Sequence, residues 1–216
     1  MGDSTRLTDS SVHALLERLA SSDPVPGGGS ASALAGAMGA ALVAMVAELT
    51  IGRPDYAEHE ASLQEIRAAA RDWQVELLEL AEQDATAYEA VVHARRMPKD
   101  SEPDREARAS MLRTAMVDAA RLPLRTATVV AEVLDLAQRI APIGNPNAVS
   151  DAGVAAQLAA AALRGALLNV RINLPYLAAD EPLRHSSPTE VARLESLAAD
   201  GERAAMAAVD ARMEPS

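Results

Sequence analysis

Residues 33–47 decide the fold; they read Ala-Leu-Ala-Gly-Ala-Met-Gly-Ala-Ala-Leu-Val-Ala-Met-Val-Ala, with Glu48 directly after them. None of these side chains is polar. A membrane-spanning helix needs about 20 strongly apolar residues, whereas this run is shorter and consists mostly of Ala and Gly. We therefore interpret it as a buried core helix and expect no membrane partner.

A second run of the same kind begins at residue 154. Gly36 and Gly39 in the first run, and Gly165 in the second, permit close contact between helices. Helices this small and this apolar on every side need cover all round. The two runs therefore predict central helices and self-association of the chain.

Helical periodicity continues outward from these runs, and no alternating strand pattern of any length occurs. We predict an all-α fold, a compact helical bundle forming one domain over residues 1–216 with its core at about 7–211. Ser30 or Ser32 is expected to cap the first central helix, and Pro123 to begin a new one. The expected helices cover residues 7–20, 30–51, 56–96, 105–120, 123–140, the stretch ending at about 173, and 188–211.

Composition narrows the functional class. The net charge of −11 over 216 residues argues against a nucleic-acid partner, and it means that an anionic substrate must be held by locally placed Arg. Cysteine is absent, and no basic region followed by an apolar stretch opens the chain, so we expect a cytoplasmic protein. The histidines are not spaced for zinc, so we expect no metal.

The densest polar stretch is Asn145-Pro-Asn-Ala-Val-Ser-Asp151, just before the second apolar run. One of Asn147, Ser150 and Asp151 is explained as the helix N-cap. Capping does not need all of them, and Asp151 alone among them can exchange a proton. We take Asn145, Asn147 and Ser150 as ligand-binding candidates and Asp151 as a catalytic candidate.

A second candidate is Pro26-Gly-Gly-Gly-Ser30, where Gly27, Gly28 and Gly29 precede a predicted helix. Backbone N–H groups at such a helix start can bind an anion. A tight turn with a serine cap is an equally good interpretation.

Arg164, Asn169 and Arg171 lie on the helix that starts near Asp151. Asn169 shares a face with Asp151, but the two are roughly 27 Å apart along a straight helix. One site can therefore include both only if the helix breaks or a second subunit contributes its copy. Polar contacts at a subunit interface are as good an interpretation.

Asp84, within the predicted helix 56–96, is a second proton-active candidate if its face is buried.

Four motifs, in order and with matching spacing, resemble the cyclodeaminase/cyclohydrolase family. That family comprises the C-terminal domain of formiminotransferase-cyclodeaminase and stand-alone methenyltetrahydrofolate cyclohydrolases. The motifs are Pro24-x-Pro-Gly-Gly-Gly-Ser-x-x-Ala, Leu49-Thr-Ile-Gly52, Gly144-Asn-Pro-Asn-Ala-Val-Ser-Asp-Ala-Gly153 and Arg164-Gly-Ala-Leu-Leu-Asn-Val-Arg-Ile-Asn173.

The resemblance implies a homodimer with a tetrahydrofolate substrate. The reaction is either addition of water to the carbon bridging N5 and N10, or attack of N10 on a formimino carbon with loss of ammonia. Asp151 and Asp84 would move protons without a metal, and Asn147 and Asn169 would orient the substrate. Ser30 and the amides of residues 27–29 would hold a carbonyl or anionic group, and Arg164 or Arg171 the glutamate carboxylates.

A third interpretation is a catalytically silent helical dimer that binds folate or scaffolds a partner, its polar stretches serving as caps and interface.

Overall fold

The computed structural model describes residues 6–213, and the described chain contains helices but no strand. The prediction of an all-α fold is therefore confirmed. The α-helices are α1 (Val12–Leu19), α2 (Gly28–Glu48), α3 (Glu60–Arg96), α4 (Glu102–Ile140), α5 (Val149–Asn173) and α6 (Pro182–Met213). Short 3₁₀ helices occur at η1 (Leu7–Asp9), η2 (Pro54–His59), η3 (Pro146–Ala148) and η4 (Leu174–Tyr176).

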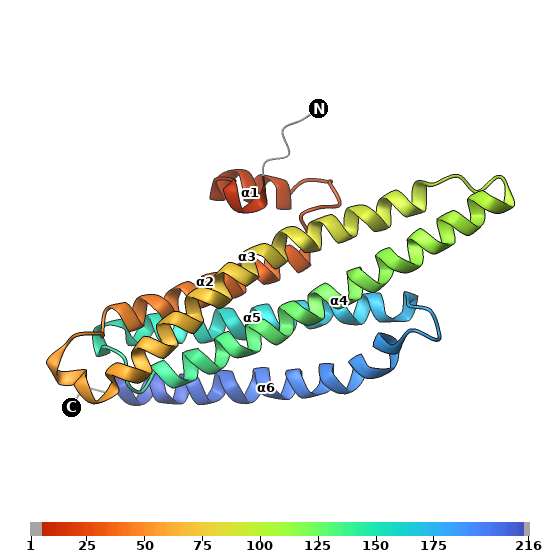
Figure 1. Cartoon of the computed structure of the whole chain (residues 1–216). Coiled ribbons are helices and arrows are strands. Elements are labelled where there is room, and N and C mark those ends of the chain that lie inside the picture. Colours follow the sequence, from red (N-terminus) through yellow and green to blue (C-terminus); the bar gives the residue numbers. More distant parts are fainter. Residues whose placement is uncertain (1–5, 214–216) are drawn as a thin grey trace.

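The five long helices run lengthwise in one bundle (Figure 1). Helices α3 and α4 form a hairpin whose loop end projects beyond the others, and the short α1 lies outside the bundle. Helix α5 packs against α2, α4 and α6, and α2 also packs against α3. Helices α2 and α5 are antiparallel, because Gly28 lies beside Asn169 while Leu49 lies beside Asn145.

Small residues bring the central helices together, as predicted. A Cβ added at Gly36 would lie 2.6 Å from Val130 Cγ2, and one at Gly165 would lie 2.5 Å from Ser32 Oγ. At Gly39 it would lie 3.1 Å from the Ala155 carbonyl oxygen. The backbones therefore approach more closely than any larger residue allows.

Two segments, Gly28–Glu48 and Pro146–Tyr176, are long and apolar enough to cross a membrane. Of their most apolar windows, 61% and 56% is buried within the bundle, a pattern typical of core helices in soluble proteins too.

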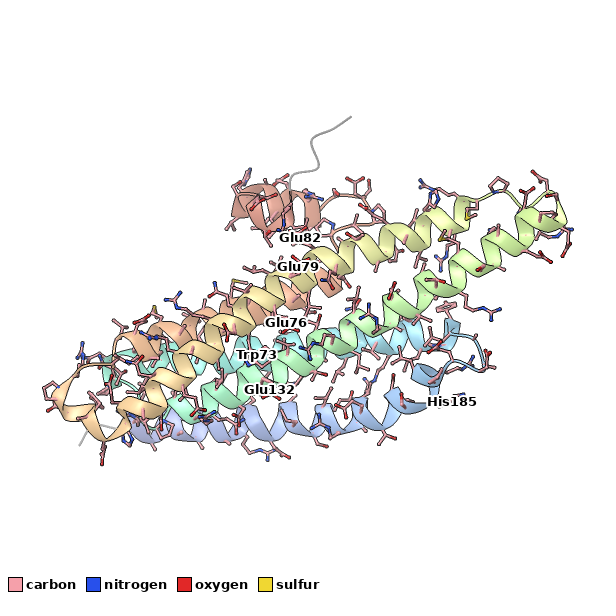
Figure 2. The ribbon with its side chains drawn as sticks, viewed as in Figure 1. Trp73, Glu76, Glu79, Glu82, Glu132 and His185 are labelled. Atoms are coloured by element: carbon pink, nitrogen blue, oxygen red, sulfur yellow. The ribbon has the colours of Figure 1, made fainter. Side chains whose placement is uncertain are left out.

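The acidic face of α3 is exposed at Glu79 and half-buried at Glu76 and Glu82, and all three carboxylates have partners. Glu76, Glu79 and Glu82 follow one another along the helix (Figure 2). Glu79 bonds Arg6 at 2.8 Å, and Glu82 accepts a hydrogen bond from the Thr8 N–H at 2.8 Å. Such contacts hold the N-terminal segment against α3, at up to about 1 kcal/mol each.

The expected helix start at Pro123 is wrong, because α4 continues through it. Proline has no N–H, so the carbonyl of Ala119 loses its helical partner. Asn173 Nδ2 donates to that carbonyl at 2.7 Å and replaces the missing bond. Pro123 is itself buried, so packing also favours the continuous helix.

Other predicted boundaries also need correction. The expected helix over 7–20 divides at Ser11, whose hydroxyl accepts from the Ala14 N–H and caps α1. Helix α6 begins at Pro182 rather than 188, since proline suits a first helical turn. Neither Ser30 nor Ser32 caps α2, which begins at Gly28 with Gly27 as its N-cap.

Candidate active site

A cavity of about 410 Å³ lies where the start of α2 meets the middle of α3 and the end of α5. We call it the Asp84 cavity. Its volume falls within the range of small-ligand sites. Its lining residues are Pro24, Val25, Gly27, Gly28, Gly29, Asp84, Tyr88, Arg95, Ala119, Asn169, Ile172, Asn173 and Tyr176.

Asp84 is the ionisable group best placed for proton transfer in this cavity. It is half-buried, and its Oδ2 accepts a hydrogen bond from the Ser30 hydroxyl at 2.9 Å. Burial raises the pKa of Asp84, and the hydrogen bonds from the Ser30 hydroxyl and backbone N–H oppose that rise only in part. A carboxyl group with a raised pKa can both accept and return a proton nearer neutral pH.

The glycines make room for this carboxyl group. A Cβ added at Gly29 would lie 2.2 Å from Asp84 Oδ1, which is impossible without movement of the acid. The start of α2 therefore receives Asp84 itself, and the Ser30 hydroxyl points to Asp84 and to the Ala81 carbonyl, at 3.0 Å. Ser30 is fully buried and its hydroxyl positions the acid, so a direct role of Ser30 in holding a substrate group stays a prediction that this arrangement does not support.

Helix α5 supplies two amides from the opposite wall. Asn169 Nδ2 donates to the Gly165 carbonyl at 2.9 Å and lies 3.5 Å from where a Cβ of Gly28 would be. Its Oδ1 makes no hydrogen bond among residues 6–213 and remains available to a ligand. Asn173 is held by the Ala119 carbonyl, which Pro123 leaves free. An apparent helix breaker thereby orients a cavity residue.

The Asn145–Asp151 stretch lies at the opposite end of α5. The predicted side-chain cap is wrong: Ala148 is the N-cap, and neither Asn147, Ser150 nor Asp151 caps α5. The side chain of Asn145 instead accepts from the Asn147 N–H at 3.0 Å and caps η3. Helix α5 is continuous, so within one chain Asp151 and Asn169 belong to different places, as the spacing predicts.

Within this stretch buried Asn145 has partners, whereas the side chains of Asn147 and Ser150 make no hydrogen bond to residues 6–213. Asn145 is buried; its N–H donates to Thr50 Oγ1 at 2.8 Å, and its Nδ2 to the Leu49 carbonyl at 3.3 Å. Asn147 and Ser150 are exposed. Asp151 is half-buried, and its carboxylate has no hydrogen bond or ion pair within the described part of the chain.

Arg164 and Arg171 do not line the Asp84 cavity. Arg164 forms an ion pair with Glu202, and Arg171 with Glu195, both on α6. These ion pairs fasten α6 to α5, so the arrangement gives no support to a role for either arginine in holding glutamate carboxylates.

Sequence reasoning missed several cavity residues, among them Tyr88, Arg95 and Tyr176. Positions 84, 88 and 95 are four and seven residues apart, so they share one face of α3. Helical spacing from Asp84 was the signal that could have found the first two. Tyr176 lies in η4, beyond the regular helix, where no periodicity applies.

No group of three or more His, Asp or Glu side chains suited to a metal occurs within residues 6–213. The expectation of metal-free chemistry stays a prediction.

Comparison with known proteins identifies the family. The model of the formiminotransferase-cyclodeaminase family matches residues 11–193. The chain is 44% identical over 162 residues to a methenyltetrahydrofolate cyclohydrolase of Methylorubrum extorquens, covering 75% of this chain and 78% of that protein. It is 31% identical to the formimidoyltransferase-cyclodeaminase of Rattus norvegicus, covering 85% of this chain but 35% of that protein.

A solved structure agrees. The crystal structure of formiminotetrahydrofolate cyclodeaminase from Thermotoga maritima aligns with a TM-score of 0.84 at 27% identity, covering 95% of this chain and 98% of that one. The chain belongs to the formiminotransferase-cyclodeaminase family.

Proposed function

We propose that this protein is a tetrahydrofolate one-carbon enzyme, and that it hydrolyses 5,10-methenyltetrahydrofolate to 10-formyltetrahydrofolate. The observation that carries the proposal is Asp84, a half-buried carboxyl group with a raised pKa in a cavity opposite Asn169. The relative with 44% identity is a cyclohydrolase, which favours hydrolysis over deamination.

In the proposed reaction, the water oxygen attacks the positively charged bridging carbon while the Asp84 carboxylate accepts a proton from that water. Asn169, on the wall opposite Asp84, would orient the folate through its Oδ1. The C–N5 bond of the tetrahedral adduct then breaks, N5 gains a proton and the hydroxyl loses one, leaving a formyl group on N10. One water is consumed and one proton is released overall. Proton transfer by a positioned carboxylate contributes about 10²- to 10⁴-fold to rate.

Formimidoyltetrahydrofolate cyclodeamination is the second candidate, because the aligned Thermotoga maritima protein carries that name. There N10 attacks the formimino carbon on N5, and the same acid would deliver a proton to the departing ammonia. Neither route uses a metal in our proposal, since a carboxylate can carry out each proton transfer.

Purified protein supplied separately with each folate tests this proposal. A fall in methenyl absorbance with 5,10-methenyltetrahydrofolate supports the cyclohydrolase, and a rise with 5-formimidoyltetrahydrofolate supports the cyclodeaminase. Folate binding without turnover of either compound would instead support the catalytically silent dimer.

We also propose that the protein is a homodimer joined through α2 and α5. Each helix carries a stripe of apolar or glycine residues at alternating spacings of four and three, with no member fully buried. The stripes border the bundle core, because Gly165 faces Ser32, and Ala35 and Leu42 pack against buried residues. Such a stripe is typical of a helix seam. On α2 and its C-cap it consists of Ala31, Ala35, Met38, Leu42, Met45 and Leu49. On α5 it consists of Val154, Leu158, Ala161, Gly165, Leu168 and Ile172.

Several large apolar side chains of these stripes are exposed to solvent. Met38 is 55% exposed, Leu168 62% and Ile172 66%, on helices whose opposite faces form the core. Clustered exposed apolar residues of this size mark interaction surfaces. A second copy is the occupant we propose, because both stripes have a seam pattern and closed two-fold dimers are the commonest oligomers.

Such a dimer would give the Asn145–Asp151 stretch a role. Asp151 occupies the next position of the α5 stripe, three residues before Val154, while Ile172 ends the stripe and also lines the Asp84 cavity. A two-fold axis through the middle of the stripe exchanges its ends, which are roughly 30 Å apart. It would bring Asp151 of one subunit beside the Asp84 cavity of the other.

Hybrid dimers test this arrangement. Asp84→Asn and Asp151→Asn subunits with different tags are co-expressed, and the doubly tagged dimer is isolated. If the site is shared, each hybrid keeps one intact site and about half of the wild-type activity, although both parent dimers are inactive. A hybrid as inactive as its parents would contradict a shared site.

A further inference from the structure

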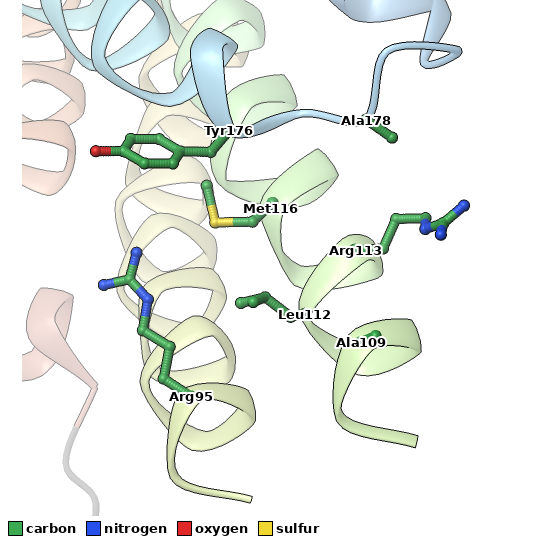
Figure 3. A pocket seen from close by; sticks show the side chains of 7 residues that line it. All are labelled: Arg95, Ala109, Leu112, Arg113, Met116, Tyr176 and Ala178. Carbon is green, nitrogen blue, oxygen red and sulfur yellow. The ribbon is translucent and has the colours of Figure 1, made fainter. Parts of the chain in front are cut away.

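A second hollow of about 280 Å³ adjoins the Asp84 cavity at the projecting end of the α3–α4 hairpin (Figure 3). Its lining residues are Arg95, Ala109, Leu112, Arg113, Met116, Tyr176 and Ala178. We call it the Arg95 pocket. Arg95 and Tyr176 line both hollows, so the two are neighbouring parts of one recess.

The two arginines of this pocket have free guanidinium groups within the described part of the chain. Neither the Arg95 nor the Arg113 guanidinium makes a hydrogen bond or ion pair within residues 6–213, unlike Arg171, which pairs with Glu195. In a chain of net charge −11, two unpaired guanidinium groups beside one recess are positioned to attract an anion. Guanidinium groups suit carboxylates, because they can donate two parallel hydrogen bonds.

The rest of the wall is apolar. Leu112 and Met116 come from α4 and Tyr176 from η4. In Figure 3 Leu112 and Met116 lie between the two arginines, while the Tyr176 ring lies on the Arg95 side. An apolar slot of this kind suits a flat ring, with the phenol of Tyr176 available for stacking. The pocket therefore combines a surface for a ring with cations for carboxylates.

The direction of the α3 side chains connects the pocket to the reaction site. Asp84 and Arg95 are separated by eleven residues, roughly 16 Å along the helix axis. Helical side chains lean toward the N-terminus of their helix. The Arg95 guanidinium accordingly reaches back toward Met116 and Tyr176, on the side of the Asp84 cavity (Figure 3).

We propose that the Arg95 pocket binds the aminobenzoyl-glutamate half of the folate while the one-carbon unit lies at Asp84. Arg95 pairs with a glutamate carboxylate, and Leu112, Met116 and Tyr176 contact the benzoyl ring. Arg113, on the other wall, is available to the second carboxylate. This inference rests on the proposed function and replaces the expectation that Arg164 or Arg171 binds the tail.

A truncated substrate tests the proposal. Turnover of 5,10-methenyltetrahydrofolate and of the corresponding pteroyl amide, which lacks the glutamate and both of its carboxylates, is measured for wild type and Arg95→Gln. We expect Arg95→Gln to lower kcat/KM for the complete substrate about 10- to 100-fold, mainly through KM, as for loss of a charged hydrogen bond. For the truncated substrate, Arg95→Gln and wild type should have the same kcat/KM, because this substrate has no glutamate carboxylate to pair with Arg95.

Arg203→Gln is the control, since it removes the same charge from an exposed site on α6 that lines neither hollow; it should leave turnover of both substrates unchanged. Equal losses for both substrates in Arg95→Gln, or no loss for either, would overturn the tail assignment while wild-type turnover still upheld the proposed function. Wild-type protein inactive on both compounds would overturn the proposed function, and this inference with it.

Discussion

The two ends of the α2–α5 pair both carry polar residues but have different structures. At one end, the start of α2 and the end of α5 surround an open cavity in which Asp84 is held by Ser30. At the other end, buried Asn145 bonds to Thr50 and Leu49, and the Arg212 guanidinium donates to the Gly144 carbonyl at 2.7 Å. The buried groups of a dense polar motif can thus bond one another, whereas an aspartate held by one serine in an open cavity can remain available for chemistry.

Replacing the carboxylate at the open end should have the largest effect. Asp84→Asn keeps the size of the side chain but removes its proton transfer, so we expect kcat to fall about 10²- to 10⁴-fold. Circular dichroism and thermal unfolding should report an intact fold. The control is Asp72→Asn, an exposed aspartate on the same helix, which should keep full activity. An Asp84→Asn enzyme with wild-type kcat would show that the carboxylate in the open cavity does not transfer the proton.

Adding a methyl group at each end should sharpen the comparison. In Gly29→Ala the new Cβ displaces the Asp84 carboxyl group, and a misplacement of about 1 Å can cost about 10²-fold in kcat. In Gly153→Ala, near Asp151, the nearest atom is 3.4 Å away at Val209, an ordinary contact. We expect its turnover to stay within a few-fold of wild type, as steady-state kinetics can check. Equal losses in both variants would contradict the steric role of Gly29.

The pH dependence of activity and stability should run in opposite directions at Asp84. A general base must be ionised, so kcat/KM should rise with pH through the raised pKa of Asp84 and then level off. Burial favours the neutral acid in the folded state. The neutral Asp84 carboxyl group therefore contributes most to the free energy of unfolding below the ordinary aspartate pKa. This contribution is lost as pH rises through the raised pKa that Asp84 has in the folded state.

Unfolding of wild type and Asp84→Asn across this range measures the second effect. Asp84→Asn should gain stability relative to wild type as pH increases from the ordinary aspartate pKa through the raised pKa of Asp84. A constant difference between the two would mean that the ionised group carries no penalty from burial.

At the other end of the α2–α5 pair, where Asn145 bonds to Thr50, we expect a change in stability without a change in kcat. Thr50→Val leaves the buried N–H of Asn145 without its 2.8 Å acceptor, at a cost of about 1–3 kcal/mol in the free energy of unfolding. Thr128→Val is the control, because its half-buried hydroxyl donates only to the Leu124 carbonyl four residues earlier. Denaturant unfolding should show a clearly smaller loss for the control. A large loss of turnover in Thr50→Val, with the fold intact, would show that the contacts of Asn145 contribute to catalysis as well as to stability.

Much of the fold followed from the sequence, because helix periodicity and small-residue runs are local properties. The all-α class, the central position of residues 33–47 and the close contacts at Gly36, Gly39 and Gly165 are confirmed. Helix boundaries were less predictable. Pro123 looked like a helix start because the loss of one hydrogen bond is visible locally, whereas the replacement donor, Asn173, is 50 residues away.

The candidate site was predicted in part. The sequence by itself identified Asp84, the glycines at 27–29, Ser30 and Asn169 as candidates, and its ordered motifs indicated the family. It could not tell that Ser30 serves Asp84, that Arg164 and Arg171 pair with α6, or that Arg95 remains unpaired. Only the tertiary structure decided these matters, because the availability of a polar group depends on which distant groups have already satisfied it.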